Sequence, residues 1–188
     1  MSAFAKMEEP PYRTMSGLEQ GVAETLDFEA LMQFYGPKIF RFALASLRDR
    51  DDAETVTQDC FLRAFKAQGS FRHECSMQTW LMQIAVNLVR DRQRSRRLQF
   101  WKRVKPLDEP ETSSCSPETA VAMRQQVESV WKAAALLPEK QRTVFLLRFV
   151  EDMDILEIAA ATGMKEGTVK THMFRALQAV RERLGQPR

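Results

Sequence analysis

The chain has 188 residues, 44% of them hydrophobic and 28% charged, which is the composition of an ordinary soluble globular protein. Its net charge is only +3, and no apolar run approaches the roughly 18 residues needed to span a bilayer. With no signal-peptide pattern at the N-terminus, we expect a cytoplasmic protein without membrane insertion. The three cysteines are widely separated and form no C-x-x-C pair, which argues against a disulfide framework or a structural zinc site.

The first 50 residues predict an extension followed by one helix. Residues 1–26 are polar, contain two adjacent prolines and show no sustained period, so we expect them to be poorly ordered. Asp27 is a predicted N-cap for a helix that runs to about Leu47 with apolar residues along one face. Gly36-Pro37 should bend or divide this helix.

A second helix is predicted between Asp51 and Gly69. Asp51 and Glu54 form a D-x-x-E start that is close to a capping box, and Gly69 is a natural stop. Its buried side is predicted to contain Val56, Cys60, Phe61, Ala64 and Phe65. The start of this helix is acidic, which is expected either of a solvated face or of a docking surface for a basic partner.

The stretch from Ser76 to Lys105 is apolar in its first half and strongly basic in its second. Ser76 is a predicted N-cap, and the basic half carries eight arginines and lysines against the single acid Asp91. Phe100 and Trp101 lie inside the basic run. An isolated basic run is usually a solvated helix end. The alternative is a surface whose charges hold phosphates and whose aromatic rings stack on unpaired bases.

The remainder of the chain predicts a linker and a second helical domain. Residues 106–117 contain three prolines, three serines and three acids, a composition typical of a flexible tether. Further on, Asp154 with Glu157 starts a short helix, Gly163 provides a turn, and a longer helix follows. This order is typical of a helix-turn-helix, although ordinary helical hairpins imitate it. The predicted fold class is therefore all-α, with two small helical domains joined by a flexible linker.

Two sets of motifs resemble bacterial RNA polymerase sigma factors of the sigma-70 family, and specifically the extracytoplasmic-function group. The first set is D-A-E-T-V-T-Q-D and T-W-L-x-x-I-A-V-N, and the second is L-P-E-K-Q-R-T-V-F-L-L-R-F followed by I-A-A-A-T-G-M-K-E-G-T-V-K-T-H-M-F-R-A-L. The resemblance implies a region 2 domain over residues 27–99, a linker over 100–117 and a region 4 domain over 118–188. In this family the linker passes near the polymerase active cleft, where an acidic strand could mimic RNA; an inert tether is equally consistent with its residues.

The resemblance also implies three binding surfaces. Core RNA polymerase, through its beta-prime clamp, would contact Asp52, Glu54, Thr55, Gln58 and Asp59. The minus-ten promoter element would contact Phe71, Arg72, His73, Ser76, Met77, Gln78, Trp80, Asn87, Arg90 and Arg94. The minus-thirty-five element would contact Lys165, Thr168, Lys170, Thr171, Phe174 and Arg175. His172 and Leu177 replace arginines that are common in the family, which should weaken phosphate contacts.

We therefore expect a promoter-specificity factor that binds core polymerase, including its beta flap, reads two promoter elements and nucleates melting. The alternative is a helix-turn-helix regulator that binds duplex DNA without polymerase; an acidic helix followed by a basic one disfavours it. An anti-sigma factor is expected from the resemblance alone. The sequence contains no phosphate-binding glycine loop and no metal-ligand cluster, since His73 and Cys75 are too few for a closed site. We predict no enzymatic activity, no cofactor and no metal.

Overall fold

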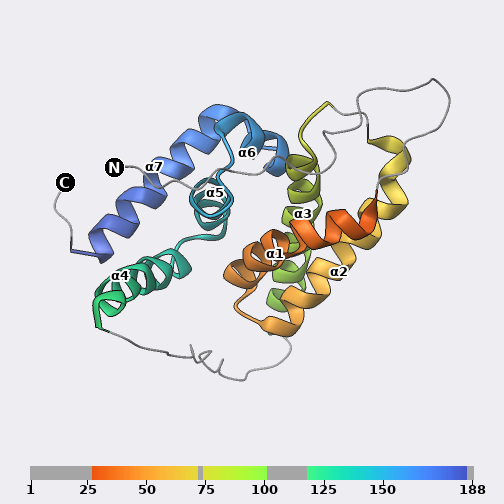
Figure 1. Ribbon diagram of the computed structural model, residues 1–188. Coiled ribbons are helices and arrows are strands. Elements are labelled where there is room, and N and C mark those ends of the chain that lie inside the picture. Colours follow the sequence, from red (N-terminus) through yellow and green to blue (C-terminus); the bar gives the residue numbers. More distant parts are fainter. Residues whose placement is uncertain (1–26, 72–73, 101–117, 186–188) are drawn as a thin grey trace, which may run out of the picture.

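The computed structural model describes residues 27–71, 74–100 and 118–185. Within these ranges the chain is all-α, as predicted (Figure 1). The helices are α1 (Phe28–Leu47), α2 (Arg50–Ala67), the single-turn 3-10 helix η2 (Gln68–Ser70), α3 (Met77–Phe100), α4 (Glu118–Ala135), α5 (Glu139–Phe149), α6 (Ile155–Thr162) and α7 (Glu166–Arg183). The predicted N-terminal extension and the proline-rich linker lie outside the described residues.

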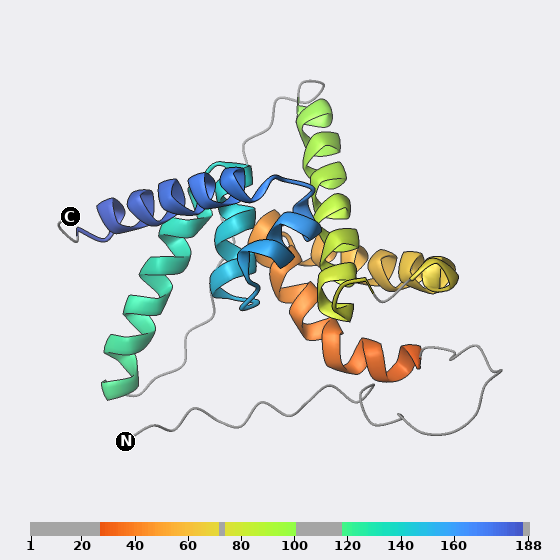
Figure 2. The same ribbon diagram turned by 90° about the horizontal axis from the view of Figure 1, so that it is seen from above.

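Side-chain caps begin α1, α2, α3 and α6, three of them as predicted, whereas α5 and α7 begin without one. The Asp27 carboxylate accepts hydrogen bonds from two backbone N–H groups of the first turn of α1, each at 3.1 Å. α1 continues through Pro37 and changes direction, so the proline bends the helix without dividing it (Figure 2). The predicted start of α2 at Asp51 was wrong. Asp49 is the N-cap, because its backbone is extended and its carboxylate accepts from the Asp52 N–H at 2.9 Å.

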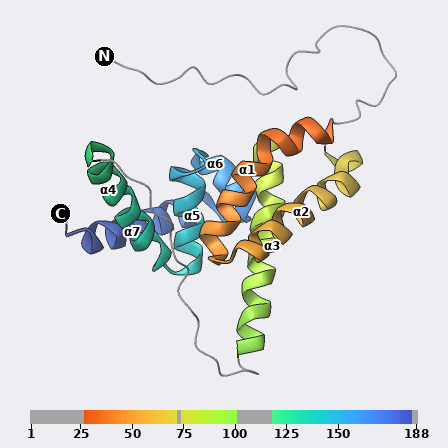
Figure 3. The ribbon, with the colours of Figure 1, turned by 60° about the horizontal axis from the view of Figure 1, so that its bottom comes forward.

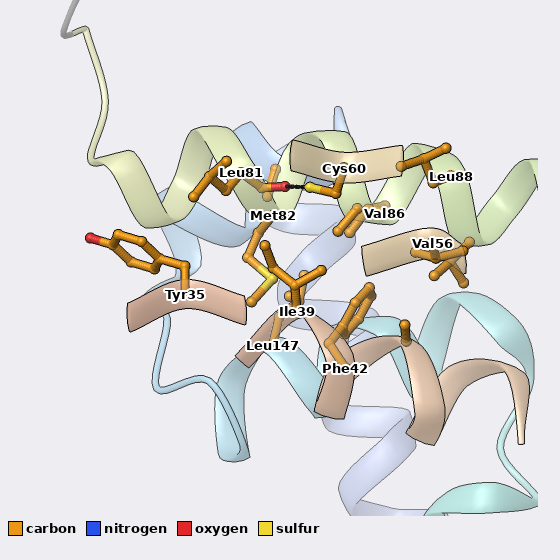
Figure 4. Close-up of a cluster of buried hydrophobic side chains, with 14 of the residues drawn as sticks. Tyr35, Ile39, Phe42, Val56, Cys60, Leu81, Met82, Val86, Leu88 and Leu147 are labelled. Atoms are coloured by element: carbon orange, nitrogen blue, oxygen red, sulfur yellow. Dashed lines mark hydrogen bonds between the residues drawn. The ribbon is translucent and has the colours of Figure 1, made fainter. Parts of the chain in front are cut away.

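Helices α1, α2 and α3 pack together as the N-terminal half. Their core contains fully buried side chains such as Phe42, Val56 and Leu81, several of which are shown in Figure 4. Cys60 is also buried; its Sγ donates to the Leu81 carbonyl at 3.5 Å, and burial raises the pKa of its thiol to about 12. Phe65, predicted to be buried, is 55% exposed, because it lies near the end of α2.

Helices α4 to α7 form the C-terminal half, and α6 with α7 is the predicted helix-turn-helix. α6 begins with a complete capping box between Asp154 and Glu157. It ends at Gly163, whose φ of 68° is left-handed and therefore favours glycine. Val169 and Ala176 are fully buried on the inner side of α7, so the opposite side of that helix remains on the surface.

The two halves are not separate bodies, a feature with no signal in the sequence. α1 packs against α5 and α3 packs against α6. The apolar core is continuous across this junction, and Figure 4 shows Leu147 of α5 beside Ile39 of α1 and Met82 of α3. The basic end of α3 extends beyond the rest of the molecule (Figures 2 and 3).

Candidate functional site

The predicted polymerase-binding residues lie together on α2. Glu54 and Gln58 are exposed, and Thr55 and Asp59 are partly exposed beside them. The spacing of three and four residues places them on one helical face. Glu54 pairs with Arg50 at 2.9 Å, and the Thr55 hydroxyl donates to the carbonyl one turn earlier. The face therefore offers acidic and amide groups to a basic partner.

Asp52 differs from its neighbours because it is engaged within the chain. Its side chain is only 21% exposed and forms ion pairs with Arg96 and, at 3.6 Å, with Arg92 of α3. Arg96 also pairs with Asp49 at 2.8 Å and donates to the Leu47 carbonyl at 2.9 Å. These contacts fasten α3 to the start of α2, and no sequence signal indicated them.

Seven of the ten predicted minus-ten residues belong to the loop before α3 and the first turn of α3. The Phe71 and Trp80 rings, both half-buried, lie 4.8 Å apart with an angle of 32° between them. Ser76 caps α3 as predicted, its hydroxyl accepting from the Thr79 N–H at 3.1 Å. Met77 is buried in the core, so its side chain is not on the surface in this arrangement. The predicted residues 72 and 73 lie outside the described part of the chain.

The remaining minus-ten residues form a basic stripe along α3. Asn87, Arg90 and Arg94 are exposed at helical spacing, and Arg90 donates to the Asn87 side chain at 3.4 Å. Arg94 makes no ion pair or hydrogen bond within the described residues. A cleft of about 240 Å³ lies between this stripe and α5, where Lys140 adds another positive charge. Glu139 also lines the cleft and pairs with Arg97 at 3.1 Å, so Arg90, Arg94 and Lys140 supply its remaining positive charge.

The predicted minus-thirty-five residues lie on the outer side of α7 and at its N-terminus. Lys165, Thr168, Lys170, Thr171, Phe174 and Arg175 are all exposed, Phe174 by 69%. His172 is partly covered between them. Burial lowers the pKa of this histidine, and the positive charges of Lys140 and Arg175 lower it further, so the neutral form is favoured near neutral pH. The surface presents cations and one large apolar ring to a partner.

Several groups at the junction of the two halves escaped the sequence analysis. Arg41 of α1, Glu151 of the segment between α5 and α6, and Glu157 of α6 form polar contacts between parts of the chain that are more than 70 residues apart. Across residues 27–71, 74–100 and 118–185 there is no group of three residues that could hold a metal ion. No helix in those same ranges is long and apolar enough to cross a membrane.

Comparison with known proteins gives one consistent family. Residues 31–99 match the family model described as Sigma-70 region 2, and residues 128–180 match Sigma-70, region 4. The chain is 31% identical over 166 residues to the RNA polymerase sigma-H factor of Pseudomonas aeruginosa, covering 81% of this chain and 83% of that protein. It is 28% identical over 165 residues to the ECF RNA polymerase sigma factor SigW of Bacillus subtilis, covering 84% and 88%.

A solved structure has the same fold. The sigma factor RpoE from Bartonella quintana, crystallised in complex with the anti-sigma factor NepR, superimposes with a TM-score of 0.70 at 23% identity. The superposition covers 87% of this chain and all of that one, so it includes helices of both halves.

Proposed function

Because the chain belongs to the extracytoplasmic-function group of the sigma-70 family of RNA polymerase sigma factors, we propose that it directs core polymerase to promoters through the three surfaces described above. The acidic face of α2 binds the polymerase clamp. The loop before α3 and the basic stripe of α3 hold the separated minus-ten strand. The outer side of α7 reads the minus-thirty-five element in the major groove.

The observation that carries this proposal is the arrangement of charge on α2 and α3. One acidic face and one cationic stripe lie on adjacent helices, and both face solvent over most of their length. A regulator that only binds duplex DNA needs neither the acidic face nor a second cationic helix. The helix-turn-helix regulator acting without polymerase is therefore disfavoured, and the match to region 2 supports the same choice.

Energetics explain why the chain would act with polymerase. Separating duplex DNA costs about 1.4 kcal/mol per base-pair step on average, so a bubble of about ten steps costs more than 10 kcal/mol. Each base stacked on an aromatic ring returns about 1–3 kcal/mol. The few rings near the start of α3 cannot offset the cost of the bubble. We infer that this chain nucleates melting and that polymerase stabilises the open strands.

Control by an anti-sigma factor is part of the proposal. It is supported by the likeness to a sigma factor that was crystallised with one. The C-terminal half also exposes large apolar side chains on α5 and α6, Phe149 by 51% and Leu156 by 63%. Such side chains suit a protein partner, either the beta flap of polymerase or an anti-sigma factor.

The test is transcription with purified core polymerase on genomic fragments from the organism that encodes the chain, with start sites mapped. We expect transcripts that depend on the chain and share sequence elements about ten and thirty-five bases upstream. Asp59→Asn and Gln58→Ala should lower core affinity, whereas Glu128→Gln, which removes one charge from an exposed position on α4, should not. Arg175→Ala should impair recognition of the upstream element and spare core affinity.

Two results would contradict this assignment. The polymerase-binding role of α2 is wrong if Asp59→Asn and Gln58→Ala retain full core affinity. The proposed function as a whole is wrong if the chain gives no new transcripts with core polymerase but binds intact duplex tightly by itself.

A further inference from the structure

A second cleft, of about 460 Å³, lies where the end of α1, the second half of α3 and the turn between α4 and α5 meet. Clefts of this size accommodate small molecules. The residues that line it include none of those assigned above to polymerase or to either promoter element. The proposed function therefore gives this cleft no role.

Positive charge is concentrated on the walls of this cleft. The basic residues that line it are all arginines: Arg48, Arg96, Arg97 and Arg142. Arg96 pairs with acids at the start of α2, and Arg97 pairs at 3.1 Å with Glu139, which also lines the cleft. Within residues 27–71, 74–100 and 118–185, no carboxylate pairs with Arg48 or Arg142. The described part of the chain therefore leaves these two guanidinium charges uncompensated.

Arg48 and Arg142 also lie close enough to repel each other. Burial lowers the pKa of Arg142, the positive charge of Arg48 lowers it further, and Glu139 opposes both effects. An arginine in a protein nevertheless keeps its charge. Arg142 donates through Nη1 to the Ala135 carbonyl at 3.0 Å, which leaves most of its N–H groups for another acceptor. An anion between the two guanidinium groups would remove their repulsion and accept charged hydrogen bonds from both.

Other polar groups of the lining also lack partners. Ser46 is only 5% exposed, and its hydroxyl has no hydrogen-bond partner among the described residues. Gln93 donates through Nε2 to the Ser46 carbonyl at 3.2 Å, and its buried Oε1 is unpaired in that same part of the chain. Unpaired buried polar atoms are rare in proteins. In addition, α5 begins at the cleft wall with no side-chain cap on Pro138, and a helix N-terminus favours an anion.

The wall formed by the turn between α4 and α5 is apolar. Leu136 lines the cleft and is 64% exposed, whereas Leu137 beside it is 3% exposed and belongs to the core. Pro138 continues the same wall. A flat ring packed on Leu136 and Pro138 would remove apolar surface from water, which favours binding. The cleft thus combines a site for phosphate with a surface for a ring.

We propose that this cleft binds a small phosphorylated molecule of the nucleotide class, with its phosphates between Arg48 and Arg142 and its ring against Leu136 and Pro138. A single strand of nucleic acid carries the same chemical groups. It needs a row of cations that follows its backbone, however, whereas the two uncompensated arginines lie together at one place. The small molecule is therefore favoured, and the proposal does not depend on the proposed function.

The test is isothermal titration calorimetry of the full chain with ADP and with pyrophosphate, at about 0.15 M salt and without divalent cations. We expect both to bind, and ADP to bind more tightly because of its ring. Arg48→Gly and Arg142→Ala should each weaken ADP binding by about tenfold, since each removes charged hydrogen bonds. The matched control is Arg63→Ala, which removes an exposed arginine of α2 that does not line the cleft and should leave ADP affinity unchanged.

Arg48→Gly keeps the test valid should Arg142→Ala fail to fold, because the φ of 54° at Arg48 is left-handed and suits glycine. Circular dichroism checks the fold of each variant.

Three results would overturn the proposal. The site does not exist if ADP fails to bind, or if it binds the unaltered chain and both cleft variants equally. The ring surface is wrong if ADP binds no more tightly than pyrophosphate. The cleft serves a nucleic-acid backbone instead if both variants lose affinity for a mixed-sequence DNA single strand, measured by fluorescence anisotropy, while their ADP affinity is unchanged. Each result can occur while transcription with core polymerase is normal, so it is distinct from failure of the proposed function.

Discussion

The turn between α6 and α7 gives a prediction whose magnitude follows from backbone geometry alone. Gly163 has a φ of 68°, and a Cβ added there would meet no atom within 4 Å. Gly163→Ala therefore introduces no clash, and its cost is that of placing an L-residue in the left-handed region, about 1–2 kcal/mol. In a chain of this size 1 kcal/mol corresponds to about 2–4 °C in Tm, so we expect Tm to fall by about 2–8 °C.

The chain offers a matched control four residues later. Gly167, in the first turn of α7, has an ordinary helical φ, and its added Cβ also meets nothing within 4 Å. Gly167→Ala should leave stability unchanged or raise it by up to about 1 kcal/mol, because alanine favours the helix. Gly163→Asn should cost less than Gly163→Ala, since asparagine tolerates the left-handed region.

Thermal unfolding by circular dichroism measures all three variants, and because the halves share a core we expect a single transition. The reasoning is refuted if Gly163→Ala is as stable as the unaltered chain, or if both alanine substitutions shift Tm in the same direction by the same amount. The first result would mean that the turn is not left-handed. The second would mean that the change in helix propensity outweighs the backbone conformation.

Two further predictions concern charge and reactivity. Lys170→Ala should weaken binding to duplex DNA of any sequence and reduce the slope of log affinity against log salt concentration by about 0.9, the value for one phosphate contact. Binding titrations at several salt concentrations measure this slope. An unchanged slope would show that Lys170 does not contact a phosphate. In the native chain at pH 8, iodoacetamide should modify the exposed Cys75 and spare Cys60, because the thiolate is the reactive form and burial raises the pKa of Cys60 to about 12. Peptide mapping after a timed reaction gives the order, and early modification of Cys60 would show that α2 and α3 separate readily.

Local signals in the sequence were sufficient for most of the fold. The caps at Asp27 and Ser76 and the turn at Gly163 depend on residues within four positions of one another, so their chemistry is readable from the chain. Phe65 was predicted to be buried because it lies on the apolar side of α2. Periodicity identifies that side of the helix but does not show how far along it the neighbouring helices extend. The bounds of the two predicted domains stay a prediction.

What the sequence could not show is that the two halves meet. A flexible composition in residues 106–117 indicates freedom of the tether and carries no information about contact between the segments it joins. Leu147 and Ile158 have the helical spacing expected of a core within their own half, yet they belong to an apolar cluster that extends into α1 and α3. Nothing in the sequence relates Glu151 to Arg41, since the two residues are 110 positions apart.

The ion pairs of Asp52 bear on how the polymerase-binding face would work. With 21% of its side chain exposed and two arginines of α3 against it, Asp52 is better placed to fix α2 on α3 than to meet a partner directly. On this reasoning Arg96→Ala should lower core affinity at least as much as Asp52→Asn, since Arg96 also contacts Asp49 and the Leu47 carbonyl. The double variant should lose less than the sum of the two single losses, because both substitutions remove the Arg96–Asp52 pair. Gln58→Ala, which lies on the exposed face, should add its full effect to that of Arg96→Ala. Additive losses for Asp52→Asn and Arg96→Ala, measured by core-binding titration, would instead show that the Asp52 carboxylate contacts polymerase itself.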